Sequence, residues 1–224
     1  MELRCVIDVS RNCPMNMAID EMFFTKSDFV PVFRFYQWTE PSYSIGYFQK
    51  ISDIKNENKY PITRRMTAGL AVLHDYDLSY SLIISDDLWK HIYNQEETYK
   101  IVHNEIKKAL SAIGITCDNV TNPDTAHKDI SCVKTFYKDD VFLNGKKLVG
   151  SCQRRRGRKI LVQGSIHIKL TQEQINIFAN KIFMNISDFL NCSRYIKPIT
   201  DQETHDAGII AQTKYASDKW NKLF

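Results

Sequence analysis

The chain has 224 residues, of which 43% are hydrophobic and 25% are charged, and its formal net charge is +4. This length fits one large domain or two small ones, and the composition is that of a globular protein rather than a disordered or fibrous one. No apolar run reaches the roughly 18 residues of a membrane span, and the N-terminal segment lacks a signal-peptide core. We therefore expect a cytoplasmic protein with no membrane partner.

The first predicted helix spans residues 14–25, because apolar residues recur there three and four positions apart. Asp20 and Glu21 lie off this apolar stripe and are expected to face solvent. Two strands rich in β-branched and aromatic residues follow at 30–36 and 43–48. The second strand contains Gly46, which marks a position where a backbone or a ligand comes close.

The stretch 62–81 combines two adjacent arginines with a run of small residues. Its pattern predicts a strand, a tight turn, a second strand and then a third. Small residues let a ligand approach backbone N–H groups, and the cations of Arg64 and Arg65 suit a carboxylate, a phosphate or an acyl oxygen. On spacing alone, an ordinary hairpin with exposed arginines fits the pattern equally well.

The clearest helix spans residues 96–113 and ends at Gly114. Farther along, Asn144-Gly145 predicts a type I′ turn between strands at 141–143 and 146–149. The other expected elements are a short strand at 115–120, a polar loop at 121–130, an edge strand at 131–136, a strand at 160–168, a helix at 175–190 and a final helix or loop segment.

Residues 154–159, RRRGRK, form a basic run between two predicted strands. Such a run contacts nucleic acid, contacts an acidic protein partner, or is simply a solvated loop, and the last is the commonest case. No aromatic residues interleave with the arginines, as a stacking platform for single strands requires. No nucleic-acid partner is therefore expected.

Six cysteines occur, and no two have the C-x-x-C spacing of a zinc ribbon or a thioredoxin-like motif. They are expected to stay reduced, most as small buried side chains and one or two as reactive thiols. The histidines show no ligand spacing on a common element, so no metal is expected. His91 and His103 are expected to face solvent.

Four stretches, in this order, resemble the biotin/lipoate protein ligase superfamily, and within it the cysteine-dependent octanoyltransferases of lipoate assembly. They are Asn16–Glu21 (NMAIDE), Phe33–Gln49 (FRFYQWTEPSYSIGYFQ), Arg64–Ser81 (RRMTAGLAVLHDYDLSYS) and Gly145–Gln153 (GKKLVGSCQ). The resemblance implies an α/β (α+β) fold with a mixed, largely antiparallel sheet flanked by helices. It also implies a catalytic domain at 1–170 and a C-terminal helical extension at 171–224 packed on the same domain.

The resemblance implies transfer of an octanoyl or lipoyl group to the lysine of a lipoyl domain through a cysteine acyl-enzyme. Cys132 is then the nucleophile, and Lys147 polarises the acyl carbonyl and favours the thiolate. The acyl tail is expected in an apolar tunnel walled by residues 43–48 and 69–73. The arginines beside the turn and the basic run are expected to face an acidic carrier protein. The substrate-binding residues implied are Arg64, Arg65, Thr67, Ala68, Gly69, Ala71, His74, Gly150, Ser151 and Gln153.

The transferase interpretation needs no cofactor, whereas an ATP-dependent lipoate-protein ligase, the main alternative, needs ATP and magnesium. The expected partners are an octanoyl-carrier protein or an octanoylated lipoyl domain as donor and a lipoyl domain as acceptor, and the protein is expected to be a monomer. Four positions depart from the family pattern, and they leave open the donor and a catalytically degenerate lipoyl-binding module. These are Ala68, Leu70, Gln163 and Cys152, the last of which is also the rival nucleophile.

Overall fold

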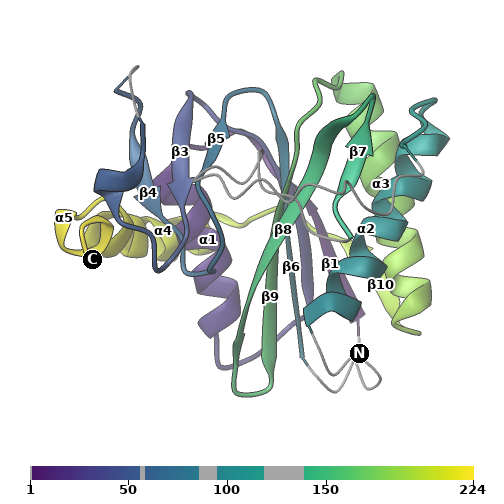
Figure 1. Cartoon of the computed structure of the whole chain (residues 1–224). Coiled ribbons are helices and arrows are strands. Elements are labelled where there is room, and N and C mark those ends of the chain that lie inside the picture. The colour runs from purple at the N-terminus through teal and green to yellow at the C-terminus, as the bar shows by residue number, and fades with distance from the viewer. Residues whose placement is uncertain (1, 56–58, 86–94, 119–138) are drawn as a thin grey trace.

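The computed structural model describes residues 2–55, 59–85, 95–118 and 139–224 (Figure 1). Its strands are β1 (Glu2–Ile7), β2 (Val32–Tyr36), β3 (Ser42–Ile45), β4 (Ile62–Arg64), β5 (Val72–His74), β6 (Leu78–Ser85), β7 (Val141–Leu143), β8 (Lys146–Arg156), β9 (Lys159–Ile166) and β10 (Ser193–Ile196). Its helices are α1 (Cys13–Thr25), α2 (Gln95–Ala112), α3 (Gln172–Phe189), α4 (Asp201–Ile210) and α5 (Asp218–Asn221), with a 3-10 turn at Ile51–Asp53 and a π-helical turn at Ala211–Tyr215.

Within this described part, seven strands form a large sheet in the order β10-β1-β2-β6-β9-β8-β7. β1 runs parallel to β10 and β2, and the remaining pairs are antiparallel. A smaller sheet has the order β4-β3-β5, so β3 lies between the two strands that flank the small-residue turn. The predicted mixed, largely antiparallel sheet is confirmed, but the ordinary hairpin considered for the stretch 62–81 is wrong.

Helices cover both faces of the large sheet (Figure 1). α2 and α3 pack on one face, where aromatic residues of β2 and β6 meet apolar residues of both helices. α1 packs on the other face, against the segment that follows α4. The large sheet thus has an apolar core on each side. None of the helices described here is long and apolar enough to cross a membrane.

Several predicted elements are confirmed with small shifts. α1 begins one residue early because the side chain of Asn12 accepts a hydrogen bond from the Met15 amide, and α2 covers the expected apolar stripe. Asn144 and Gly145 both have positive φ, as the predicted type I′ turn requires. Residues 115–118 form no strand, whereas the predicted loop at 121–130 and strand at 131–136 lie outside the described residues.

The C-terminal residues contribute more to the core than an appended helix would. Side chains of α3 form part of the core against the large sheet, and β10 extends that sheet beside β1. α5 packs near β4, where the Asn221 side chain accepts a hydrogen bond from the Arg64 amide at 2.8 Å. Residues 171–224 therefore help to hold both sheets.

Asp20 is fully buried on α1, so its expected solvent-facing position is wrong. Its carboxylate accepts hydrogen bonds from Arg34 on β2 at 2.9 Å, Ser81 on β6 at 2.7 Å and Gln163 on β9 at 2.7 Å. Arg34 is also fully buried and pairs with Asp8 as well. Burial of these charges is tolerated because each has several partners.

Replacing Asp20 with alanine is expected to lower the free energy of unfolding by about 3–5 kcal/mol, because the change leaves buried Arg34 short of countercharge. Urea denaturation measures the effect. Asp218→Ala is the matched control, since the side chain of Asp218 is 82% exposed in its pair with Lys222. That control should change stability by less than about 1 kcal/mol. Equal shifts in the two variants would contradict the role assigned to Asp20.

Candidate functional site

The turn between β4 and β5 is held from inside by Arg65. Its guanidinium donates to the carbonyl oxygens of Ala68 at 2.9 Å and Leu70 at 2.8 Å, and to the carbonyl oxygen of Ser44 on β3 at 3.0 Å. Gly69 has φ +94°, a left-handed conformation that glycine adopts without strain. The turn is thus a fixed structure that exposes its backbone at residues 68 and 69.

Gly46 and Gly69 explain why small residues are needed here. A Cβ atom built on Gly46 would lie 1.8 Å from the Gly69 carbonyl oxygen, so two backbone segments cross at this point. Ala68 does not have a positive φ, and its side chain is exposed. The departure from glycine at position 68 therefore adds no strain.

The Arg64 side chain links the backbone after β3 to the backbone of α5. Its guanidinium donates to carbonyl oxygens of Tyr47 at 2.7 Å, Gln49 at 2.6 Å and Asn221 at 2.8 Å, and its side chain is fully buried. Arg65 is also buried. The expectation that these arginines face an acidic carrier is therefore wrong. In the basic run, by contrast, Arg155, Arg156 and Arg158 are exposed.

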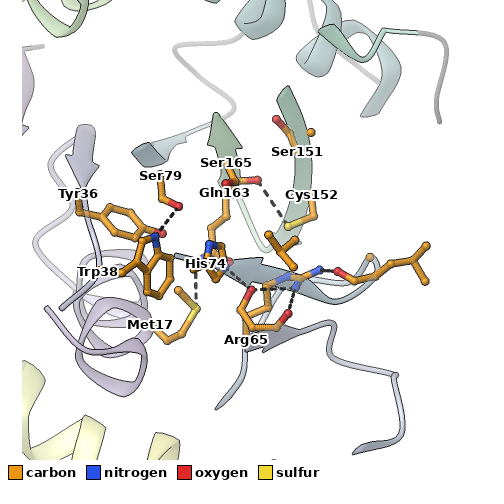
Figure 2. Close-up of a pocket in the computed structure, with 16 residues that line it drawn as sticks. Met17, Tyr36, Trp38, Arg65, His74, Ser79, Ser151, Cys152, Gln163 and Ser165 are labelled. Carbon is orange, nitrogen blue, oxygen red and sulfur yellow. Dashed lines mark hydrogen bonds between the residues drawn. The ribbon is translucent and has the colours of Figure 1, made fainter. Parts of the chain in front are cut away.

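Two cavities meet beside the turn, and Gly69, Ser151 and Cys152 line both. The smaller has a volume of about 50 Å³ and lies between the two sheets (Figure 2). The larger, of about 490 Å³, opens toward α2. Only the larger falls within the usual range of ligand pockets. Its lining includes Ala68, Glu96, Tyr99, His103, Asp139, Asp140 and Gln153.

Cys152 lines both cavities, and Figure 2 shows it among the residues of the smaller one. Its sulfur is 3.1 Å from the Thr67 hydroxyl oxygen and 3.5 Å from the Gln163 carbonyl oxygen. Thr67 gives its own hydrogen to the Gln163 side-chain oxygen at 2.8 Å, so toward Cys152 it is an acceptor. Both contacts therefore use the thiol hydrogen of Cys152.

Residues 149–156 of β8 pair regularly with β9 and point alternately to opposite sides of the sheet, and this separates Ser151 from Cys152. Cys152 and Arg154 point toward the turn, where Arg154 donates to the Met66 carbonyl oxygen at 2.9 Å. Ser151 points toward α2, where it bonds His103 at 2.6 Å. Nearer the hairpin, the pairing with β7 skips Leu148, and this bulge interrupts the alternation before Lys147.

Lys147 is buried, with 6% of its surface exposed, and its ammonium lies 2.6 Å from the Asp140 carboxylate. This position excludes the interpretation of Lys147 as an exposed strand lysine. Because Lys147 and Asp140 lie beside the larger cavity, they bring a charged pair close to any ligand there.

His74 lies on the wall of the smaller cavity. Its Nδ1 donates to Asp77 at 2.9 Å, and its Nε2 is 2.8 Å from the Ser44 hydroxyl. Burial alone raises the pKa of Asp77, but His74 and Ser165 outweigh it, so that the pKa falls below its usual range. This Ser–His–Asp order resembles a hydrolytic triad. However, all three groups are buried beside a cavity of only about 50 Å³. The hydrogen bond between Ser44 and His74 therefore serves to hold β5 on β3.

The predicted nucleophile Cys132 lies outside the described residues. Burial raises the pKa of both Cys5 and Cys13 to about 12, and it raises the pKa of Cys117 and Cys192 above the usual value. These four are poor sources of thiolate at neutral pH. Among the described cysteines, Cys152 lines the cavities.

The structure brings most of the predicted substrate-binding residues to the two cavities, but it separates others from them. Arg65, Gly69, His74, Gly150, Ser151, Ala68 and Gln153 line one or both cavities. Thr67, Arg64 and Ala71 line neither cavity, although Thr67 contacts Cys152, which does. Their roles toward a substrate stay predictions.

Sequence reasoning missed His103, which is 2% exposed rather than solvent-facing. Its position four residues after Tyr99 on α2, within the apolar stripe between Val102 and Ile106, was the available signal. It also assigned no role to Asp77 or Tyr80.

Comparison with known proteins gives consistent results. Residues 12–193 match the family described as lipoyl protein ligase A/B catalytic domain. The octanoyltransferase LipM of Clostridioides difficile (strain 630) is 34% identical over 183 residues, covering 77% of this chain and 68% of that protein. The octanoyltransferase LipM of Bacillus anthracis is 26% identical, with 97% of each chain covered. A bipartite lipoate protein ligase from Thermoplasma acidophilum, solved in work on that ligase and its E2 lipoyl domain, shares the fold with a TM-score of 0.71 at 20% identity, covering 99% of this chain and 96% of that one.

Replacing Gly69 with alanine is expected to lower the free energy of unfolding by about 1–3 kcal/mol, because alanine is strained at this φ. Its Cβ would also lie 3.0 Å from an Arg65 nitrogen. Ala68→Gly is the matched control at the preceding position. It should lower the free energy of unfolding by less than about 1 kcal/mol, because glycine only raises the conformational entropy of the unfolded chain. Thermal unfolding of both variants tests this. A larger loss for Ala68→Gly than for Gly69→Ala would show that the strain lies elsewhere.

Proposed function

Because this chain belongs to the lipoyl protein ligase A/B catalytic domain family, we propose that it transfers an octanoyl group to a lipoyl-domain lysine through a cysteine thioester. Octanoyl transfer is the activity named for the two similar LipM proteins. The observation that carries the proposal is the larger cavity of about 490 Å³, which is lined by the turn at residues 68–69 and by Ser151 and Gln153. These are positions that the resemblance assigns to substrate.

The reaction consists of two acyl transfers. In the first, the cysteine thiolate attacks the carbonyl carbon of an octanoyl thioester, the new C–S bond forms, and the donor thiolate leaves and takes a proton. In the second, the amine of the acceptor lysine attacks the same carbon, the C–N bond forms, and the cysteine sulfur leaves. Dividing one transfer into two steps in this way is covalent catalysis. The thioester supplies the activation, so ATP has no role in this sequence.

Cys132 is the proposed nucleophile, and one observation on Cys152 supports leaving the role with Cys132. The nucleophile acts as a thiolate, whereas both contacts of Cys152 use its thiol hydrogen. Cys132 precedes the β7–β8 hairpin that carries Lys147.

Lys147 is the proposed electrostatic group. Its ammonium is a cation held beside the larger cavity by Asp140. A fixed positive charge near the acyl carbonyl stabilises the negative oxygen that develops when either nucleophile attacks. The exposed arginines of the basic run are proposed to attract the acidic surface of a carrier or lipoyl domain.

An octanoyl thioester alone is expected to modify a lipoyl domain, without ATP or magnesium. Intact-mass spectrometry should find one octanoyl group first on this protein and then on the lipoyl domain. Cys132→Ser should abolish the first adduct, while serine at Cys5, Cys13, Cys117, Cys152 or Cys192 should retain it. If modification of the lipoyl domain requires a free acid and ATP, the protein is a ligase rather than a transferase. An adduct mapped to Cys152 would show that the nucleophile is misassigned.

Lys147→Ala is expected to slow transfer by at least about a hundredfold, the loss typical of removing a catalytic charge. Its neighbour Lys146 is exposed on the same hairpin, so Lys146→Ala is the matched control and should transfer at the wild-type rate. Because Lys147 pairs with buried Asp140, Lys147→Ala is also expected to lose stability. Rates are therefore compared per folded protein, below the unfolding transition. Equal rates in the two variants would remove Lys147 from the mechanism.

A further inference from the structure

Ser151 lies in the middle of a hydrogen-bonded chain that runs from the large sheet to α2. The Tyr80 hydroxyl is 2.5 Å from Ser151 Oγ, which in turn is 2.6 Å from His103 Nε2. On the other side of the ring, His103 Nδ1 is 2.6 Å from the carbonyl oxygen of Asp139. Ser151 and His103 both line the larger cavity. The middle of the chain therefore lies on the wall of the larger cavity.

The position of each hydrogen in this chain follows from Asp139. A carbonyl oxygen only accepts, so the hydrogen of the imidazole is on Nδ1. Burial lowers the pKa of His103 to about 4, so the ring is neutral at pH 7 and Nε2 is an acceptor. Ser151 then donates its hydrogen to His103, and Tyr80 donates to Ser151. Burial raises the pKa of Tyr80, which keeps that donor hydrogen in place.

Gly164 makes this arrangement sterically possible. It lies on β9 between Tyr80 on β6 and Ser151 on β8, opposite both residues in the register of the sheet. A Cβ atom at Gly164 would lie 2.3 Å from the nearest atom of the Tyr80 ring. The Tyr80 ring therefore crosses β9 in the space that a side chain would otherwise fill, and this places its hydroxyl on Ser151.

A serine that has given its one hydrogen to a histidine presents only a lone pair to the cavity. It therefore accepts a hydrogen bond from an N–H group, and it does not donate to a carbonyl oxygen. Gln153, two residues along the same face of β8, is 9% exposed, and neither its amide oxygen nor its nitrogen has a hydrogen-bond partner among the described residues. Its oxygen is a second acceptor at the same cavity.

The charged residues around this cavity suit a cationic group. Glu96, Asp139 and Asp140 line it, and Asp140 is paired with Lys147. Carboxylates lining a cleft attract an ammonium group. An alkyl acyl tail has neither a charge to pair with the carboxylates nor an N–H to donate to the two buried acceptors, whereas a lysine side chain has both.

Building on the proposed function, we propose that the larger cavity admits the acceptor lysine and that Ser151, fixed as an acceptor by His103, binds an N–H of its amine. The amine lone pair then faces the thioester carbonyl. As the C–N bond forms and the C–S bond breaks, the cysteine leaves as a thiolate and takes up the proton that the amine loses. His103 and Tyr80 are positioning residues, because both act through Ser151.

The test separates the two half-reactions and compares two kinds of nucleophile. The octanoyl-enzyme is formed from an octanoyl thioester, freed of donor, and then mixed with a lipoyl domain, with propylamine or with mercaptoethanol. A thiolate has no hydrogen to give to Ser151, so its attack does not depend on this acceptor. A variant that merely loosens the structure slows attack by amine and thiol alike.

The variants are Ser151→Ala, His103→Leu and His103→Gln, with His205→Leu as the matched control because His205 is exposed on α4. We expect Ser151→Ala and His103→Leu to form the octanoyl-enzyme normally and to react with thiol within about twofold of wild type, but to react with both amines at least about tenfold more slowly, the loss of one hydrogen bond. Glutamine offers its oxygen to Ser151, so His103→Gln should recover part of the amine rate, and His205→Leu should match wild type.

Each other result overturns the inference. Equal slowing of amine and thiol attack would give Ser151 and His103 a structural role only, and unchanged amine rates in Ser151→Ala would remove the acceptor site. Failure of the wild-type protein to form an octanoyl-enzyme is a separate result, because it overturns the proposed function and the inference with it.

Discussion

The buried carboxylate of Asp20 is the interaction on which the rest of the site depends. It holds α1 against the large sheet through Arg34 and Ser81, and it holds Gln163 on β9 through the side-chain amide. The oxygen of that amide then accepts from Thr67 in the turn. Since a buried charge must keep its partners, this chain of contacts fixes the distance between the two sheets. The turn is therefore positioned by a helix that does not touch the larger cavity.

The alternation of β8 gives one strand two separate tasks. On the side of the turn it carries Cys152, whose neighbours belong to the packing between the sheets. On the side of α2 it carries Ser151, which bonds His103, and Gln153, which lines the larger cavity. A single extended segment thus places structural and chemical residues within a few positions of each other.

The sequence was a good guide wherever local chemistry decides the structure. The apolar spacing of α1 and α2, the Asn144-Gly145 turn and the need for glycine at position 69 are all local properties, and each was predictable. The burial of Asp20 and His103 was not, because a polar residue beside an apolar stripe faces either solvent or a distant partner. Those partners, Arg34 and Ser151, come from other parts of the chain. Cys132 depended on a resemblance rather than on a local pattern, and it lies outside the described residues.

The contacts of Arg64 with α5 set a condition on how the protein folds. Asn221 and Trp220 bond the backbone and side chain of Arg64 across more than 150 positions of sequence. Contacts this distant in sequence form late, because a long loop must close first. During synthesis the strand entering the turn is made early, but its partners at 220 and 221 emerge much later. A nascent chain that reaches only to β10 thus contains the arginines, the turn and both sheets, but the contacts of residues 220 and 221 with Arg64 form only after those two residues emerge.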